Sequence, residues 1–230
     1  MLDLNQNFIY TQNLSLRQFA LNLLGKSADP ARLVGDIMDE RSLLDMAEEK
    51  GSSSLRSIVY FYRMMLEVFF GEYERAAETA ELNKNVDKDN VGRFSIVVNH
   101  CFYHGLSALI LARRQGRSKW EDIINTTMAQ MEKWESANPW NCEHKLALMN
   151  AEYAYLQNDI NGAIEAYDCA IVSAAKHRFV HEEGLALERA GIFYTDTGDN
   201  ATASRLFHRA HDCYVRWEAH SKATHVKQHF

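Results

Sequence analysis

Two histidines of this chain have the spacing of a metal site on a helix. His100 and His104 are four residues apart, so their side chains share one helical face. Paired imidazoles at this spacing can hold zinc, which takes three or four protein ligands. Cys101 is the one further ligand type nearby in sequence, and it points to another face. We therefore interpret the pair as a polar spot in a buried helix and predict no metal there.

A denser group of metal-ligand residue types lies near the carboxyl end. His208 and His211 are three residues apart on one helical face, and Asp212 is adjacent to that face. Five of the ten histidines lie from His208 onward. A metal-binding or pH-sensing end is one interpretation. The preferred interpretation is a solvated final helix that lacks a downstream partner.

The sequence motifs of common enzyme classes are missing. The chain has no G-x-x-x-x-G-K-[ST] loop, no G-x-G-x-x-G and no G-x-S-x-G. His181-Glu182-Glu183 begins like a zinc protease motif, but the second histidine is absent. We expect no catalytic residue, no cofactor, and no binding of ATP or zinc.

Composition limits the setting and the partners. The formal net charge is −6 and no lysine- or arginine-rich run occurs, so nucleic acid binding is not expected. The four cysteines have no zinc-knuckle or redox spacing, which favours a reducing, cytoplasmic setting. They are Cys101, Cys142, Cys169 and Cys213, of which the last two are predicted to be small apolar fillers on helical stripes. Residues 1–13 lack the pattern of a signal peptide.

One apolar stretch approaches the length of a membrane span. Residues 94–112 carry no formal charge, but they include Asn99, Ser95 and Ser107 besides the two histidines, and all of these are costly in lipid. Arginines flank both ends, so charge specifies no orientation. We predict a central, almost fully buried helix of a solenoid, and no membrane contact.

A repeated turn motif, which we call the corner, indicates the helices that position these residues. Residues 71–76, 158–163 and 198–203 share a turn-forming residue, then an acid, and an alanine five positions after the first. After two of these corners, alanine, an aromatic residue and alanine follow at spacings of four and three. The two stripes are Ala163, Tyr167, Ala170 and Ala203, Phe207, Ala210. Such a stripe is typical of the second helix of a tetratricopeptide-type hairpin.

The last two units repeat at 40 residues, longer than the roughly 34 of the standard tetratricopeptide unit, which suggests longer helices of a divergent type. Gly191 is expected to let the two helices of its hairpin approach closely, and Tyr194 to pack across the hairpin. Ala203 lies where the helices meet most closely, so glutamate there should be severely destabilising. Lys222 is expected on a solvated end, where alanine is nearly neutral.

Helical patterns divide the chain into pairs. Residues 1–51 form amino-terminal helices, 52–137 two divergent pairs, and 138–230 two tetratricopeptide-like pairs, all in one domain of residues 1–230. Asp29-Pro30 is predicted to cap a helix, and Ser118 with Glu121 to form a capping box. A polar loop is expected over 83–92. Predicted helices cover 14–24, 41–50, 52–71, 72–82, 93–115, 118–137, 143–157, 162–176, 182–195 and 200–217.

These residues resemble a known family along most of the chain. The densest match is Asn138-Pro139-Trp140-Asn141 with His144-Lys145, and further matches lie at 21–25, 33–35, 70–73, 102–103, 134, 151–152, 163–168, 170–171, 182–183, 193–194, 198 and 214–217. The chain is similar to the helical-repeat region of large multi-sensor signalling kinases. There, a kinase-like domain and a predicted ATPase precede this region, and a GAF domain and a histidine kinase follow it.

The resemblance implies flanking ATPase and GAF domains and a region that supplies no catalytic residues. One departure is Glu218, where the family usually has glycine after the late tryptophan. The residues that follow are also less lysine-rich than in the family.

Taken together, the patterns predict an all-α solenoid of about four to five antiparallel helix pairs. We expect a non-catalytic domain for protein interaction or signal relay. A free-standing adaptor that binds a peptide or protein is the alternative, and a metal-dependent enzyme is a third class. By analogy with standard repeats, the partner-binding residues are predicted along a concave wall. They are Lys145, Glu152, Tyr155, Glu188 and Thr195.

Overall fold

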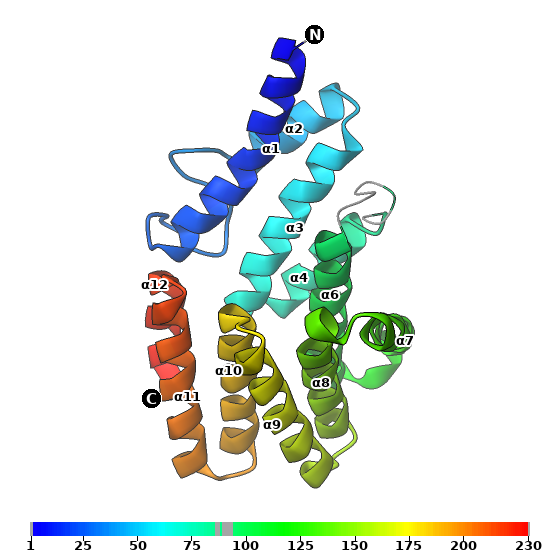
Figure 1. Cartoon of the computed structure of the whole chain (residues 1–230), viewed down its shortest axis with the longest axis vertical. Helices are drawn as coiled ribbons and strands as arrows, with labels where there is room; N and C mark the ends of the chain where they lie inside the picture. The colour runs from blue at the N-terminus through cyan, green and yellow to red at the C-terminus, as the bar shows by residue number, and fades with distance from the viewer. Residues whose placement is uncertain (1, 86–87, 89–93, 230) are drawn as a thin grey trace. The chain divides into compact units, whose positions relative to one another are not determined.

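Helices are the only regular elements in the part of the chain that the structure describes, residues 2–85, 88 and 94–229 of a computed structural model (Figure 1). Within these residues the all-α prediction is confirmed. The chain groups into two compact units, Met1–His100 and Cys101–Phe230, where the sequence predicted one domain. The division falls inside helix α6 (Phe94–Gln115). Most of the predicted loop at 83–92 lies outside the described residues.

In its described residues, the first unit contains four further helices. They are α1 (Leu2–Leu23), α2 (Glu40–Glu49), α3 (Ser53–Phe69) and α4 (Tyr73–Leu82). Helix α3 packs against α1, α2 and α4. Helix α3 contributes much of the core of the unit, since Leu55, Val59, Met65, Leu66 and Phe69 are buried.

The segment between α1 and α2 is a loop and not the predicted helix. Asp29 accepts a hydrogen bond from the Ala31 backbone N–H at 2.9 Å, so it closes a local turn. Asn22, buried on α1, donates its amide to the carbonyl oxygens of Asp29 and Pro30 at 3.3 and 3.0 Å. The prediction at Asp29-Pro30 is wrong because side chains of a preceding helix satisfy the loop backbone without a new helix.

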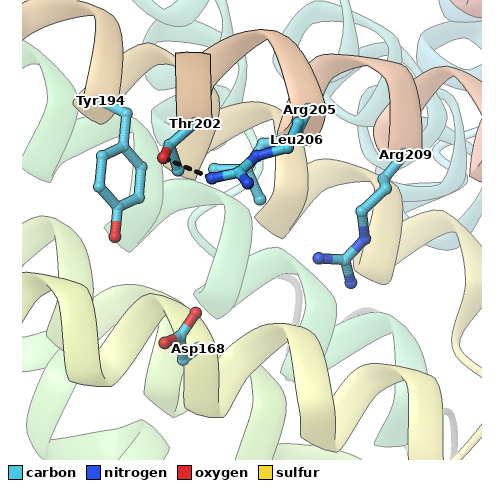
Figure 2. Close-up of a pocket in the computed structure, with 6 residues that line it drawn as sticks. All are labelled: Asp168, Tyr194, Thr202, Arg205, Leu206 and Arg209. Carbon is cyan, nitrogen blue, oxygen red and sulfur yellow. Dashed lines mark hydrogen bonds between the residues drawn. The ribbon is translucent and has the colours of Figure 1, made fainter. Parts of the chain in front are cut away.

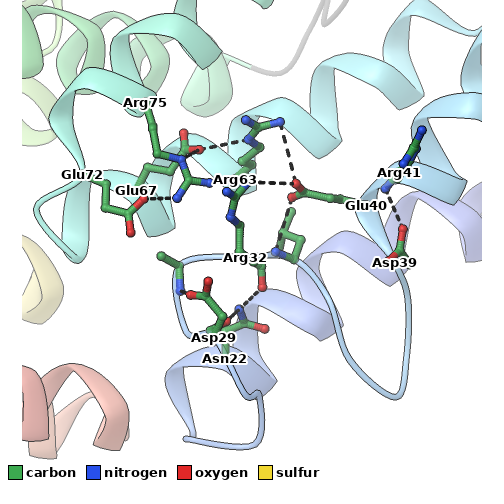
Figure 3. Close-up of polar contacts among 12 residues, drawn as sticks. Asn22, Asp29, Arg32, Asp39, Glu40, Arg41, Arg63, Glu67, Glu72 and Arg75 are labelled. Carbon is green, nitrogen blue, oxygen red and sulfur yellow. Dashed lines mark hydrogen bonds and ion pairs between the residues drawn. The ribbon is translucent and has the colours of Figure 1, made fainter.

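A buried charge cluster joins the helices of the first unit (Figure 3). Arg63 of α3 donates to Glu67 at 3.0 Å and lies 3.8 Å from Glu40 of α2. Arg75 of α4 reaches the same Glu67 carboxylate at 3.8 Å. Burial raises the pKa of Glu67, although the Thr79 and Arg63 contacts oppose the shift.

The second unit contains the remaining helices. They are η1 (Arg117–Lys119), α7 (Glu121–Ala137), α8 (Pro139–Leu156), α9 (Ile160–Lys176), α10 (Val180–Asp196), α11 (Asn200–Arg216), α12 (His220–Val226) and η2 (Lys227–His229). Each helix from α7 to α12 packs against the next, and α8 also contacts α10. This last contact joins the first helices of two successive hairpins.

The three predicted corners share one backbone geometry. Gly71, Asn158 and Gly198 all have left-handed backbone, with φ of 78°, 61° and 91°. The next residue donates its backbone N–H to a carbonyl five residues earlier, a Schellman arrangement that ends the helix. These bonds run from Glu72 to Glu67, Asp159 to Ala154 and Asp199 to Tyr194 at 2.8, 2.9 and 2.9 Å.

The acid of the corner begins the second helix in two cases of three. The Asp159 and Asp199 carboxylates accept from the backbone N–H of Gly162 and Thr202, each at 3.0 Å. Glu72 caps no backbone group and pairs with Arg75 instead. One residue therefore ends a helix through its N–H and starts the next through its carboxylate, which explains why the connections are so short.

Two further corners were not expected from sequence. Arg178 and Glu218 are left-handed, with φ of 63° and 60°. The following N–H groups bond back to Ala174 and Tyr214, as at the other corners. Left-handed backbone disfavours arginine and glutamate, so these residue types gave no signal. A glycine at position 218 would adopt this backbone without strain.

The predicted small–aromatic–small stripes are buried. All six residues, Ala163, Tyr167, Ala170, Ala203, Phe207 and Ala210, lie in the core. Gly191 of α10 faces the Phe207 ring, and a methyl group at Gly191 would stand 2.7 Å from a ring carbon. The prediction of close approach at Gly191 is confirmed.

Gly191→Ala is expected to lower the free energy of unfolding by about 1–3 kcal/mol, because the added methyl overpacks the Phe207 contact. The better helix propensity of alanine, about 1 kcal/mol, opposes this loss only in part. Urea unfolding of the purified chain measures the difference. In a Phe207→Leu background the same change should cost less, and an equal cost in both backgrounds would contradict the contact.

Other local predictions need correction. Ser118 and Glu121 form no capping box, since α7 has no side-chain cap and residues 117–119 form a 3-10 turn. Glu121 instead lies 3.3 Å from Arg117, which is four residues earlier. Helix α8 begins at Pro139, four residues before its predicted start, because proline is favoured in a first turn. Cys169 is exposed and not an apolar filler, whereas Cys213 is buried.

Helix α6 is long and apolar enough to cross a membrane by length and composition. In its most apolar 18-residue window, 61% of the residues are buried. Gly105 of α6 lies close to α7 and α8. A methyl group added at Gly105 would stand 2.5 Å from atoms of Thr127 on α7 and Met149 on α8. Most of this window is therefore buried, although less completely than the sequence predicted.

Candidate functional site

Three of the five predicted partner-contact residues are buried in the second unit. The exposed fractions of Lys145, Glu152 and Glu188 are 3%, 0% and 6%. Tyr155 is half-buried and its hydroxyl donates to Asp196 at 2.8 Å, while Thr195 is exposed. The buried three belong to separate polar clusters, so their charged groups are engaged inside the unit. Partner contact by these five residues stays a prediction.

The first cluster is centred on Glu182 of α10. Lys145 of α8 donates to its carboxylate at 2.9 Å, and His144 hydrogen-bonds to the same group. The His144 ring stacks on Phe179, with centroids 4.4 Å apart. Burial would raise the pKa of Glu182, but Lys145, His181 and His144 together outweigh it and hold that pKa well below its usual range. Burial lowers the pKa of His144, which favours the neutral form of its ring.

The second cluster is centred on Glu152 of α8. Arg189 of α10 and Arg113 of α6 donate to its two oxygens at 2.6 and 2.7 Å. The Tyr167 hydroxyl of α9 donates to it at 2.8 Å. Arg113 also lies over the Tyr155 ring, 3.9 Å from its centroid. The single carboxylate therefore holds four helices together.

Acid is expected to remove the contribution of Glu152 to stability. Burial alone would raise the pKa of Glu152, but Arg189 and Arg113 outweigh it and lower the pKa from 4.5 to about 2. A lowered pKa stabilises the fold above the unfolded pKa, so about 3 kcal/mol should be lost as the pH falls from about 5 to 2.

Urea unfolding between pH 7 and 2 measures this dependence. Glu152→Gln should flatten it, whereas Glu165→Gln, on the exposed face of α9, should leave it unchanged. Equal pH profiles for the parent and Glu152→Gln would contradict the assignment.

The third cluster corrects a prediction. Lys222 of α12 has an exposed fraction of 0%, where the sequence suggested a solvated end. Its ammonium donates to Glu188 at 2.7 Å, and the Tyr214 hydroxyl donates to the other carboxylate oxygen at 2.7 Å. Burial lowers the pKa of Lys222, and the Glu188 charge opposes that shift. The expectation failed because α12 packs on α11 and covers the lysine stem.

The first and third clusters use equivalent positions with opposite charge. Glu182 lies four residues after the left-handed corner at Arg178, and Lys222 lies four after the corner at Glu218. The two are 40 residues apart, which is the repeat length. Each pairs with the preceding first helix, as anion to Lys145 and as cation to Glu188. Glu182 and Lys222 are charged residues at the same position of two successive repeats, and this is the sequence signal that could have revealed the two ion pairs.

The histidine groups do not assemble a metal site among the described residues. His100 lies 3.3 Å from the Ala80 carbonyl oxygen in a buried setting. His208 contacts the Ser204 carbonyl oxygen at 2.8 Å, and His211 lies 3.3 Å from Asp212. Each ring thus contacts a neighbour on its own helix or one other helix.

An open groove lies between α9 and α11 (Figure 2). Its volume is about 350 Å³, within the size range of ligand pockets. Leu206 is its buried apolar member, and Tyr194 of α10 reaches into it, as expected for a residue that packs across the hairpin. The six lining residues, which we call the α9–α11 groove, are Asp168, Tyr194, Thr202, Arg205, Leu206 and Arg209.

Comparison with known proteins gives no relative. No family model, no curated protein and no solved structure matches the chain. The all-α class therefore rests on the structure alone, and membership in the signalling-kinase family is a proposal.

Proposed function

We propose that the chain is a non-catalytic helical-repeat domain that binds a protein or peptide partner. The observation that carries the proposal is the repeated corner, in which a left-handed residue, a capping acid and a buried alanine recur. Repeats of this kind are the building blocks of solenoids, whose extended surfaces bind other molecules.

The packing order supports a tetratricopeptide-like arrangement in the second unit. Helices α8, α9, α10 and α11 form two hairpins, and α9 and α8 both contact α10 of the next hairpin. The α9 stripe contacts the next hairpin, since the Tyr167 ring centroid lies 5.4 Å from that of Phe193 on α10, as in a stacked array. The α11 stripe packs on α10 of its own hairpin at Gly191.

The charged residues of the second unit favour a structural role over a catalytic one. Glu152, Glu182 and Glu188 are each neutralised by a cation from another helix. A group that is saturated in this way is a poor general base or nucleophile, because its partner would first have to leave. The clusters instead fix how successive helices stack.

For the biological setting, we propose a cytoplasmic signal-relay segment like the helical region of multi-sensor kinases, flanked by ATPase and GAF domains. Partner binding would shift the stacking of the hairpins and so bias the neighbouring domains. The alternative is a free-standing adaptor, which the open α9–α11 groove favours equally.

Selection of a peptide phage library on the purified chain tests the proposal. We expect enriched peptides that bind saturably in calorimetry with Kd values of about 100 µM or tighter, near −5.5 kcal/mol. A parallel selection on urea-unfolded chain removes peptides that bind any exposed apolar surface. If no enriched peptide binds the folded chain saturably, the interaction function is wrong.

A further inference from the structure

The α9–α11 groove carries two exposed arginines of α11. Arg205 donates to Thr202 at 2.8 Å, which holds its guanidinium at the groove wall. Arg209 lies one turn further along α11, is exposed, and forms no ion pair with another described residue. Figure 2 shows its guanidinium extending into the opening above Asp168. In contrast to the three buried clusters, these charges face solvent.

The charge of the groove differs in sign from that of the whole chain. Two arginines and one aspartate line it, whereas the chain carries a formal net charge of −6. The Tyr194 hydroxyl adds a neutral donor, since burial, Asp168 and Asp199 all raise the pKa of that phenol. Each arginine suits a carboxylate, which can accept two parallel N–H bonds from one guanidinium, and the hydroxyl adds a further donor.

Asp168 narrows the class of ligand further. A small free anion or a continuous polyanion would place negative charge beside this carboxylate. An extended peptide reduces the conflict, because a carboxylate side chain can meet the arginines while backbone N–H groups nearby donate to Asp168.

We propose that the α9–α11 groove binds an extended peptide segment through an acidic side chain. Arg205 and Arg209 hold the peptide carboxylate, the Tyr194 hydroxyl donates to it, and Asp168 accepts from a backbone N–H one residue away. Leu206 supplies the apolar base of the contact. This inference rests on the proposed interaction function and assigns it a site and a ligand chemistry.

Fluorescence anisotropy with a labelled serine-rich peptide that carries one central glutamate, the serine–glutamate peptide, tests the proposal. Arg209→Gln should weaken binding about three- to tenfold, because it removes one charge-assisted contact at a solvent-exposed site. Asp168→Asn should strengthen binding about two- to threefold, because the amide oxygen can still accept from the peptide backbone while the repulsion of the nearby peptide carboxylate is removed. Two variants of one groove are thus expected to act in opposite directions.

Arg17→Gln is the matched control, since Arg17 is an exposed arginine on a helix of the other unit. It should leave the affinity unchanged. All of the substituted side chains are exposed, so the variants should unfold like the parent.

The proposal is overturned if the serine–glutamate peptide fails to bind the parent at about 1 mM. It is also overturned if Arg209→Gln binds as the parent does, if a serine–lysine peptide binds equally well, or if equimolar inorganic phosphate displaces the peptide. Phage-selected peptides that bind independently of Arg209 would leave the interaction function intact and refute the groove alone.

Discussion

Lys222→Ala is expected to lower the free energy of unfolding by about 3–5 kcal/mol. The substitution leaves the carboxylate of Glu188 buried with the Tyr214 hydroxyl as its remaining donor in the cluster. Removing one partner of a buried ion pair is costly, because the other charge keeps its desolvation penalty without its counter-charge. Thermal and urea unfolding of the purified variants measure the loss.

Lys133→Ala is the matched control, because Lys133 is an exposed lysine on α7 of the same unit. It should stay within about 0.5 kcal/mol of the parent. Adding Glu188→Gln to Lys222→Ala should recover part of the loss, because a neutral amide can still accept from Tyr214. If Lys222→Ala unfolds at the same temperature and urea concentration as the Lys133→Ala control, the ion pair between Lys222 and Glu188 does not stabilise the unit.

The hairpins could be predicted from sequence because their signals are local. Glycine or asparagine at a corner, an acid next to it and alanine five positions on all act within one turn of chain. Where the corner residue is Arg178 or Glu218, the backbone is the same but the residue type disfavours it. Those corners are imposed by packing of the helices on either side, which a local pattern does not reveal.

The buried ion pairs could not be predicted in the same way. Lysine and glutamate are usually exposed, so Lys145 and Glu152 were assigned to a partner surface and Lys222 to a solvated end. Their partners lie 34 to 39 residues away on other helices. Whether such a side chain is exposed depends on the stacking of successive hairpins.

The α9–α11 groove was missed for a related reason. Its lining comes from three helices, and the two arginines are separated from Asp168 by more than thirty residues. Neither a basic run nor a recognised motif marks them. The arginines at 205 and 209 are four apart on α11, so a scan for exposed same-charge pairs on one helical face could have found half of the site.

Ala203→Glu is expected to cost about 4 kcal/mol or more and to unfold or loosen the α10–α11 hairpin. Ala203 is buried one turn before Phe207, whose ring already fills the space beside Gly191. A glutamate there must overpack this contact or place a carboxylate in the core, and each alternative is destabilising. Either alternative gives a loss of free energy of unfolding at the upper end of what single substitutions produce.

Ala201→Glu separates this effect from simple addition of a charge to the helix. Ala201 is exposed two residues earlier, in the first turn of α11, where a negative side chain interacts favourably with the helix dipole. We therefore expect Ala201→Glu to melt at or slightly above the parent temperature and Ala203→Glu far below it. Similar melting of the two variants would mean that Ala203 does not face α10, and that the helix register implied by the repeated corner is wrong.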